Sequence, residues 1–488
     1  MHDAFILGSW LLWILHPTIV FALAIRVIMR RPATGVALAW LLLIALTPFL
    51  GPLFYLLVGE RRIERSRGSR LKTFRADAQQ LAAQGQVAEM TQIDWTAQPP
   101  IAAAMDKLGT RLAGIPTAGG NNFQLFDRTD EILRTISADI DRAQKSVLME
   151  FYIWNAGGEA DRVLEALCRA AQRGICCYLL VDALGARPWW KSDQPRRLRA
   201  AGVHLRAALP TGLGRAVLGR NDLRLHRKIV VVDGTTAWTG SMNLVDPRFF
   251  KQDSGVGRWV DAMVRLEGFV AAPLALTMLG DWALETKQPL ADLVCETELQ
   301  VPPPCGTAAI QVVPSGPGES GDAQLQMMLA LIHGATAAIL MTTPYFVPDD
   351  ALLFAVRGAV SRGVAVKLIV PEKVDSFLTR HASRSYFDEL LECGVEIYLY
   401  GKGLLHTKSI SVDGRIAMFG TVNLDMRSIW LNYEVALYVY DQSLVGQLVH
   451  LQQSYLADAT RLTPQVWNER RYVHRFLENT LRLASPLL

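Results

Sequence analysis

Two long apolar stretches open the chain and differ from the mixed pattern that follows them. Ala4–Ile25 has 22 residues and Pro32–Gly59 has 28, and neither contains a formally charged side chain. Because about 20 apolar residues cross a bilayer as a helix, residues 1–60 are predicted to form a hairpin of two transmembrane helices. A helix pair buried in a soluble core is the alternative interpretation.

Basic residues beside these stretches predict their orientation. Three arginines lie between the stretches, and six basic residues follow the second one between positions 61 and 72. Under the positive-inside rule, this excess places the remainder of the chain on the cytoplasmic side. No basic segment precedes the first stretch, which argues against a cleaved signal peptide.

After a polar connector, predicted at 61–104 and helical in pattern, apolar runs typical of strands alternate with helical segments. The pattern occurs twice, on either side of a proline-containing linker at 288–307. The first series has helices at 129–144 and 159–173 and strands at 146–154, 175–182 and 203–209. The second has helices at 321–335 and 383–392 and strands at 337–346, 364–371 and 395–401.

This repeat predicts the fold class. Alternating helices and strands indicate an α/β protein with a mixed sheet. We expect two similar α/β/α domains, at 105–287 and 308–488, related by a pseudo-twofold axis. Residues from 443 onward are predicted to be mainly helical. Their basic and aromatic end, Trp467–Leu488, is interpreted as a packing helix, with contact to a membrane as the alternative.

The same polar motif occurs once in each predicted domain. Leu225–Asn243 reads LHRKIVVVDGTTAWTGSMN, and Leu405–Asn423 reads LHTKSISVDGRIAMFGTVN. Both fit His-x-Lys-x4-Asp-x6-Gly-[Ser/Thr]-x-Asn without a gap, and the two histidines are 180 residues apart. A single His-x-Lys would be interpreted as two exposed surface residues without a function. Two matched copies instead predict two half-sites that bind one substrate together.

Each motif has the pattern of a β-hairpin. A β-branched run ends in Asp-Gly, a strong turn signal, and a second run follows. Since side chains alternate along a strand, His226 and Lys228 share one face, as do His406 and Lys408. Asp233 and Asp413 are an odd number of residues from their histidines. They are therefore interpreted as structural anchors within the motif rather than as acids.

The motif residues suit chemistry at a phosphoryl centre. Two histidines across a cleft can act as nucleophile and general acid. Lys228 and Lys408 supply positive charge, and Asn243 and Asn423 supply neutral donors for developing negative charge on oxygen. The sequence contains no acidic cluster with the spacing of a metal site, so neither a metal nor another cofactor is expected.

Two acidic residues in apolar strands are candidates to orient the histidines. Asp261 follows the first motif and Glu434 follows the second. A carboxylate in an apolar strand is costly unless it is paired. We expect Asp261 to orient His226 and Glu434 to orient His406, with salt-bridged core acids as the alternative.

Charge and cysteine content narrow the function further. The 488-residue chain has a formal net charge of +4, which is small for a sequence-independent nucleic-acid binder. Its six cysteines show neither a CxxC pair nor a metal-ligand spacing, and they are expected to be reduced thiols.

The duplicated motif resembles that of the phospholipase D superfamily. The similarity to the bacterial cardiolipin synthases with two N-terminal spans is closer still. It rests on TGSMNLVDPRFFKQDSGVGRWVDAMVRLEG, LLHTKSISVDG and GTVNLDMRSIWLNYE, together with the two apolar stretches. The resemblance covers essentially the whole chain and implies a multi-pass enzyme of the bacterial inner membrane.

The resemblance also implies a reaction. A phosphatidyl group passes from one phosphatidylglycerol to another, giving cardiolipin and glycerol through a phosphatidyl-histidine intermediate. His226 is the implied nucleophile and His406 the general acid and base. Lys228, Lys408, Asn243 and Asn423 hold the phosphate oxygens, with Ser241 and Thr421 as helpers.

Other functions stay open at this point. A hydrolytic phospholipase D, a synthase that uses phosphatidylethanolamine as its second lipid, a nuclease of the same superfamily and a non-catalytic lipid-binding membrane protein all share parts of the pattern. The low net charge and the apolar stretches argue against a nuclease, and two complete motifs argue against a non-catalytic protein. The sequence does not indicate an oligomeric state.

Overall fold

A computed structural model describes residues 2–32, 34–59, 93–210, 212, 222–318, 322–483 and 485. The basic segment at 61–72 and most of the predicted connector at 61–104 lie outside the described residues. The chain divides into two compact units, one of Met1–Arg65 with Thr211–Asp222 and one of Ser66–Pro210 with Leu223–Leu488.

The smaller unit is built from apolar helices. They are α1 (His2–Arg30), α2 (Thr34–Leu46), α3 (Leu50–Phe54) and the π-helix η1 (Tyr55–Gly59). Among the described residues, no helix combines the length and the apolar character that a bilayer crossing requires. The two predicted transmembrane helices are therefore not confirmed, and residues 47–49 divide the second one.

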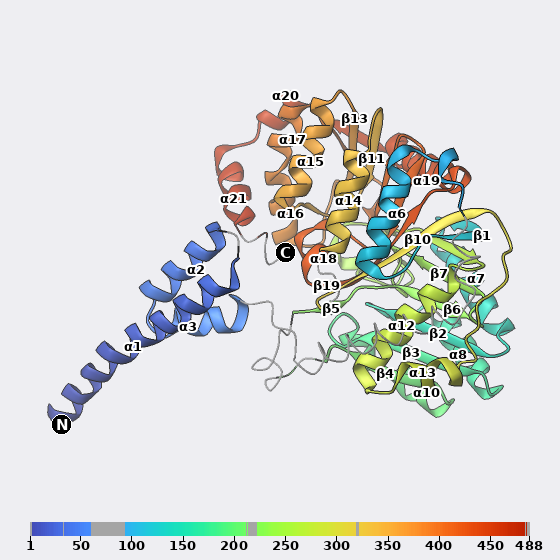
Figure 1. Ribbon diagram of the computed structural model, residues 1–488, viewed down its shortest axis with the longest axis horizontal. Helices are drawn as coiled ribbons and strands as arrows, with labels where there is room; N and C mark the ends of the chain where they lie inside the picture. The colour runs from blue at the N-terminus through green and yellow to red at the C-terminus, as the bar shows by residue number, and fades with distance from the viewer. Residues whose placement is uncertain are drawn as a thin grey trace. The chain divides into compact units, whose positions relative to one another are not determined.

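The larger unit contains both copies of the repeat (Figure 1). It begins with η2 (Trp95–Ala97) and α6 (Pro100–Ala113). The first half then comprises β1 (Ala118–Phe126), α7 (Thr129–Arg142), β2 (Ser146–Phe151), α8 (Glu159–Gln172), β3 (Cys176–Asp182), α9 (Arg187–Trp190), α10 (Gln194–Ala200), β4 (His204–Ala208), β5 (Arg224–Leu225), β6 (Ile229–Val232), β7 (Thr236–Gly240), η3 (Gln252–Ser254), β8 (Trp259–Val260), β9 (Met263–Glu267), α12 (Ala271–Thr286) and α13 (Leu290–Glu296).

The second half follows the same plan. It comprises β10 (Ala308–Ser315), α14 (Ala323–His333), β11 (Ala338–Thr342), β12 (Phe346–Val347), α15 (Asp350–Ser361), β13 (Ala365–Pro371), α16 (Phe377–Ser385), α17 (Phe387–Cys393), β14 (Glu396–Tyr400), β15 (Leu404–Leu405), β16 (Ser409–Val412), β17 (Ile416–Gly420), β18 (Leu424–Asp425), α18 (Met426–Trp430), β19 (Asn432–Val439), α19 (Gln442–Ala457), β20 (Ala459–Leu462), α20 (Pro464–Asn468) and α21 (Tyr472–Arg482).

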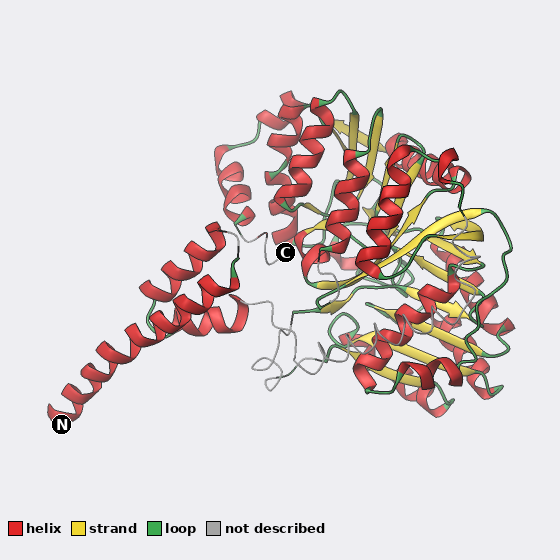
Figure 2. Cartoon of the chain, viewed as in Figure 1, coloured by secondary structure: helices red, strands yellow, loops and turns green. Residues whose placement is uncertain are grey.

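The strand order confirms the predicted duplication. From the outside inward, the first half runs β4-β3-β2-β6-β7-β9-β1 and the second runs β14-β13-β11-β16-β17-β19-β10, with β20 added at the outer edge. The halves join where β1 and β10 pair antiparallel, Ala118 opposite Ile310. Figure 2 shows the resulting strands lined up between layers of helices. The fold is the mixed α/β sheet expected from the sequence.

A shared core makes the two halves one structure. A cluster of buried side chains joins residues of both halves, among them Ile229 and Val231 on β6 and Val435 and Leu437 on β19. The helices α12, which follows β9, and α19, which follows β19, contribute buried side chains to this cluster, among them Leu274 and Leu448. Since burial of apolar area is the main stabilising term in folding, separating the halves would expose much of the core to water.

Two very short parallel strand pairs also cross between the halves. Arg224 and Leu225 of β5 lie opposite Asn432 and Tyr433 of β19. In the same way, β15 of the second half pairs with β8 of the first. Each pair brings the start of one histidine motif alongside the acidic residue of the other half.

Most predicted elements agree with the structure, and three differ. The strand predicted at 337–346 is two strands, β11 in the large sheet and β12, which pairs with β18. The helix predicted at 383–392 is two helices, α16 and α17, because the chain turns at Tyr386. The C-terminal region contains β20, which pairs with β14 at the edge of the sheet. Its alternation is too short to separate from the surrounding helical pattern.

The close packing around Gly420, in the second motif, predicts the effect of a substitution at this position. A Cβ on Gly420 would lie 2.4 Å from the Val435 carbonyl oxygen and 2.9 Å from the Ala436 Cα, both backbone atoms of the paired strand. We expect Gly420→Ala to lower the free energy of unfolding by about 1–3 kcal/mol, measured by denaturant titration, because neither atom can move without breaking the ladder.

Gly446 on α19 provides the matched control. It is exposed, and a Cβ there would meet no atom within 4 Å. Gly446→Ala should therefore stabilise the protein by about 0.5–1 kcal/mol through helix propensity. Equal effects of the two substitutions would contradict the close approach at Gly420.

Candidate active site

The two histidines lie at the junction of the halves, and each is held by the opposite half. His226 Nδ1 is 2.8 Å from Glu434 Oε2, and His406 Nδ1 is 2.7 Å from Asp261 Oδ1. The predicted pairing of Asp261 with His226 and of Glu434 with His406 is therefore wrong, because the partners are exchanged.

The short crossing strands cause this exchange. The His226 backbone N–H donates to Tyr433 O at 2.9 Å, and the His406 N–H donates to Val260 O at 2.8 Å. Each histidine thus continues a strand pair whose partner residue immediately precedes the carboxylate. Distance along the chain suggested a pairing within each half, but the ladder between the halves determines the contact.

Hydroxyl groups of the motifs hold the two carboxylates in place. Ser241 Oγ donates to Asp261 Oδ1 at 2.6 Å, and Thr421 Oγ1 donates to Glu434 Oε2 at 2.5 Å. Asn432 Nδ2 donates to the other oxygen of Glu434 at 3.1 Å. Ser241 and Thr421 therefore position the residues that hold the histidines. Because Nδ1 of each imidazole is engaged, Nε2 is the nitrogen left for chemistry.

Aromatic rings pack against both imidazoles, and neither ring belongs to the duplicated motif. The Tyr152 ring lies 5.1 Å from that of His226, and the Trp259 ring lies 4.4 Å from that of His406. His226 is 7% exposed and His406 is 4% exposed. Tyr152 lies within the strand predicted at 146–154 and directly follows β2 in the structure, but its contact with His226 arises only from the folded sheet and has no sequence signal of its own.

The two motif lysines are fully buried beside the histidines. Lys228 Nζ donates to the His226 carbonyl oxygen and Lys408 Nζ to that of His406, each at 2.5 Å. Burial lowers the pKa of Lys228 to about 8, even though Glu434 and Asp261 favour its charge. Burial also lowers the pKa of Lys408 well below its ordinary value.

The motif asparagines occupy equivalent positions with different contacts. Asn243 Oδ1 accepts from the backbone N–H of Ile153 at 3.2 Å. Asn423 Oδ1 is buried and has no hydrogen-bond donor among the described residues. Near it, Asp425 accepts from Ser428 N at 2.6 Å, and burial raises the pKa of Asp425 to about 6.

The environment of the site shifts both histidines and both carboxylates in the same direction. Burial is the largest cause that lowers the pKa values of His226 and His406, each to about 4. Burial alone would raise the pKa values of Glu434 and Asp261, but the adjacent imidazoles and lysines lower them overall. These shifts favour neutral imidazoles and ionised carboxylates at neutral pH before substrate binds.

The motif aspartates lie in the hairpin turns and act as anchors, as the geometry predicted. Asp233 accepts from the backbone N–H groups of Gln144, Lys145 and Ser146. Asp413 makes the equivalent bonds to Thr336, Ala337 and Ala338. Both turn residues have φ of 53°. They tie each hairpin to the start of the neighbouring strand, away from the histidines.

Arg227 occupies the variable position between His226 and Lys228, so the motif pattern predicts no role for it. Its buried guanidinium contacts Asp281 on α12, Nε donates to Glu434 O at 3.0 Å, and Nη2 donates to Ser315 O at 3.1 Å. Thr407 is the counterpart of Arg227 in the second motif, and its hydroxyl forms a hydrogen bond with that of Tyr455 on α19 at 3.0 Å.

Among the described residues, no group of three or more His, Cys, Asp and Glu side chains could hold a metal ion.

Comparison with known proteins gives concordant results. Residues 136–254 and 328–454 match a family model described as cardiolipin synthase, PLD-like domain, and residues 18–60 match one described as phospholipase D-nuclease N-terminal. The chain is 40% identical over 493 residues to cardiolipin synthase A of Yersinia pseudotuberculosis serotype O:3 (strain YPIII), covering 99% of this chain and 98% of that protein. The values for cardiolipin synthase A of Yersinia pestis are the same.

One solved structure supports the fold. Phosphatidylserine synthase of Haemophilus influenzae Rd KW20 superimposes with a TM-score of 0.57 at 16% identity, covering 79% of this chain and 100% of that one. At this level of identity, the similarity concerns the arrangement of the chain and not the substrate.

The crossed pairing predicts which histidine responds to which carboxylate. We expect Glu434→Gln to slow diethyl pyrocarbonate labelling of His226 several-fold without affecting His406, because the carboxylate makes its bonded imidazole more basic. Asp261→Asn should affect only His406. Peptide mass spectrometry at pH 7 measures both rates, and the opposite assignment would contradict the exchange between halves.

The lowered histidine pKa values predict acid sensitivity of the fold. An unfolded histidine binds a proton near pH 6.5, whereas the buried ones do so near pH 4. Stability should therefore fall as the pH drops through this window, by up to about 3 kcal/mol for each histidine.

Denaturant titrations at pH 7, 6 and 5 measure this loss. His406→Asn keeps a donor toward Asp261 and should reduce the pH dependence. His450→Asn, at an exposed position on α19, should leave it unchanged. A pH dependence that is the same in both variants would show that His406 does not carry it.

Proposed function

Because the chain belongs to the cardiolipin synthase family of the phospholipase D superfamily, we propose that it transfers a phosphatidyl group between two molecules of phosphatidylglycerol. The products are cardiolipin and glycerol. The observation that supports this reaction most directly is the pair of buried histidines, each held at Nδ1 by a carboxylate of the other half.

In the first step, His226 Nε2 attacks the phosphorus of one phosphatidylglycerol. The bond from phosphorus to the glycerol headgroup oxygen breaks, and the His406 Nε2–H gives its proton to that oxygen. Glycerol leaves, and the phosphatidyl group is bound to His226. The assignment of nucleophile and acid follows the family resemblance, since the motifs alone are symmetric.

In the second step, His406 acts as a base. Its Nε2 takes the proton from a primary hydroxyl of the second phosphatidylglycerol, and that oxygen attacks the phosphorus. The bond to His226 breaks, which releases cardiolipin and restores both histidines. His406 ends the cycle with the proton that it needs for the next substrate.

Charge in the site supports this use of the histidines. The lowered pKa values favour neutral imidazoles before substrate binds, which suits the nucleophile but not the acid. A bound phosphodiester adds a negative charge in a water-poor environment, and this raises the pKa of the imidazole that faces the leaving group. Substrate binding would thereby favour the single protonation that the first step requires.

The phosphate oxygens need positive charge and neutral donors. Lys228 and Lys408 are the buried lysines beside the histidines, and Asn243 and Asn423 end the same motifs. We assign these four residues to the phosphate, with Ser241 and Thr421 supporting them through the carboxylates. Lys228 is mainly protonated near neutral pH at a pKa of about 8.

Because its substrates are membrane lipids, the reaction is proposed to take place at the bacterial inner membrane. Residues 18–60, which match the N-terminal family model and contain most of the two apolar stretches, are proposed to hold the enzyme there. The basic residues at 61–72 favour catalytic halves on the cytoplasmic side. A water-poor position at the bilayer surface would favour a lipid hydroxyl over water as the acceptor.

Turnover of defined lipids tests the proposal. Labelled phosphatidylglycerol should give cardiolipin and glycerol in equal amounts, measured by mass spectrometry. His226→Ala and His406→Ala should each reduce the rate at least about a thousandfold, because each removes a group that forms or breaks a bond. His333→Ala, at an exposed site on α14, is the control and should keep the wild-type rate.

Other products would identify another function. Phosphatidic acid without cardiolipin would indicate a hydrolytic phospholipase D, and incorporation of phosphatidylethanolamine would indicate a different second lipid. DNA cleavage would indicate a nuclease. Rapid denaturation at alkaline pH should trap the phosphatidyl adduct on His226, whereas an adduct on His406 would reverse the two roles.

A further inference from the structure

The outer face of the last helix is unusually apolar for a surface in water. On α21, the side chains of Tyr472, Val473, Phe476 and the following Leu483 are 65–82% exposed. Helical spacing places these four positions along one side. Soluble proteins rarely leave several large apolar side chains together on one face unless the face has a partner.

The opposite face of α21 is firmly packed. Glu478 is 3% exposed and accepts from Arg384 Nε of α16 at 2.8 Å. Near the end of the helix, Arg482 Nη1 donates to Glu389 Oε1 at 2.7 Å. Figure 1 shows α21 as the outermost helix of this layer, alongside α16. Its orientation is therefore fixed, and the outward direction of the apolar side is a property of the fold.

Contacts at the start of α16 connect this surface to the surroundings of His406. Phe377 and Leu378, the first residues of α16, are 61% and 46% exposed. Two residues earlier, Asp375 accepts from Tyr345 at 2.8 Å and from Lys251 at 2.9 Å. Lys251 Nζ lies 5.5 Å from the Trp259 ring, which packs against His406.

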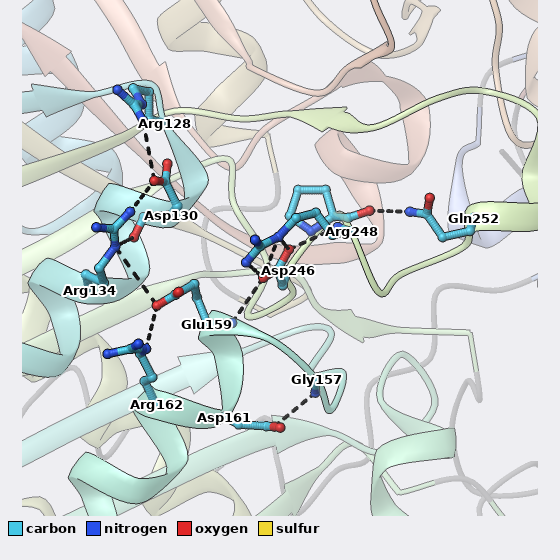
Figure 3. A network of polar contacts seen from close by, with 11 residues as sticks. Arg128, Asp130, Arg134, Gly157, Glu159, Asp161, Arg162, Asp246, Arg248 and Gln252 are labelled. Carbon is cyan, nitrogen blue, oxygen red and sulfur yellow. Dashed lines mark hydrogen bonds and ion pairs between the residues drawn. The ribbon is translucent and has the colours of Figure 1, made fainter.

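Lys251 belongs to a loop of the first half that adds another exposed aromatic ring. Phe249 in this loop is 56% exposed. Asp246 holds the loop by accepting from the backbone N–H of Glu159 and from that of Arg248, each at 3.0 Å (Figure 3). The exposed ring is thus presented by an ordered loop that contacts the second half beside His406.

The charged side chains beside these exposed apolar residues indicate which kind of partner binds them. Arg471 and Arg475 are exposed along one edge of the apolar side of α21, and Arg248 stands next to Phe249. Apolar and aromatic side chains bordered by arginines are typical of a helix that lies in the interface of an anionic membrane. Phosphatidylglycerol, the substrate of the proposed function, is itself an anionic lipid.

We propose that α21, the start of α16 and the loop at Phe249 form a docking surface that binds an anionic bilayer. We call it the docking rim. It lies in the larger unit and is a contact additional to the apolar N-terminal residues. Because the docking rim lies beside His406, its binding to the bilayer would place the entrance of the active site at the depth of the lipid headgroups. The choice of phosphatidylglycerol rests on the proposed function, whereas the apolar contact does not.

Lipid quenching tests the contact directly in the full-length protein. The two exposed cysteines, Cys295 and Cys305, are replaced by serine, and an environment-sensitive fluorophore is attached at Phe476→Cys. In vesicles that contain phosphatidylglycerol, doxyl-labelled lipid should quench the fluorophore and aqueous iodide should not. Val301→Cys, a 40% exposed apolar position on the linker between the halves, is the matched control and should respond only to iodide.

Substituting the docking rim tests its role in turnover. Tyr472→Ser with Phe476→Ser should raise the mole fraction of phosphatidylglycerol needed for half-maximal rate on the order of tenfold, with the maximal rate unchanged. Arg471→Gln and Arg475→Gln should each raise it by about fivefold. Gln447→Ser, an exposed change on α19 outside the docking rim, is the control.

Two quenching results would overturn the proposal. A fluorophore at 476 that iodide reaches in vesicles shows a face in water, and one that neither quencher reaches shows a protein partner or a second copy. If no cardiolipin forms but lipid quenches position 476, the docking rim stands and the proposed reaction fails. Unchanged lipid dependence in the Tyr472 and Phe476 variant would show that docking does not serve turnover.

Discussion

The exchange of carboxylates across the junction is the contact on which the rest of the site depends. His226 and His406 are nearly inaccessible to water, and each relies on an acid from the other half. An ionised group in such a place is costly unless it is paired, and removal of one partner typically costs about 3–5 kcal/mol. Each half-site therefore depends on a carboxylate from the other half. The central β1–β10 pair and the core shared by the halves provide the rigidity that this requires, since a small shift between halves would break both contacts.

Local sequence features were sufficient to predict the hairpins, the repeat and the anchoring role of Asp233 and Asp413. In each of these, the signal lies in a local or repeated stretch of sequence, although the backbone groups that Asp233 and Asp413 bind belong to residues far away in the chain. The partners of Asp261 and Glu434 could not be predicted in this way. Hydrophobic alternation shows that a strand exists but does not show which strand lies beside it. The two-residue strands β5, β8 and β15 are too short to produce a pattern, and yet they determine which acid meets which histidine.

The duplicated site is symmetric in its motifs and asymmetric around them. Arg227 connects the first motif to α12 and to the backbone of Glu434, whereas Thr407 makes a neutral bond to Tyr455. Asp425 adds a buried acid to the second half at the position where the first has Val245. Two identical half-sites would have no reason to divide the roles of nucleophile and acid. These differences give the two imidazoles different electrostatic surroundings, so that a division of roles has a physical basis outside the motif.

The burial that lowers the histidine pKa values also bears on the choice between transfer and hydrolysis. Water is abundant near any membrane, so a lipid hydroxyl competes as acceptor only where water is excluded and lipid is concentrated. Imidazoles that are 4–7% exposed and packed against Tyr152 and Trp259 meet the first condition. Exposed apolar residues on α21, α16 and the loop at Phe249 would meet the second by setting the entrance in the headgroup layer. Exclusion of water and supply of lipid are then two consequences of one arrangement, because Lys251 and Asp375 connect the apolar surface to the surroundings of His406.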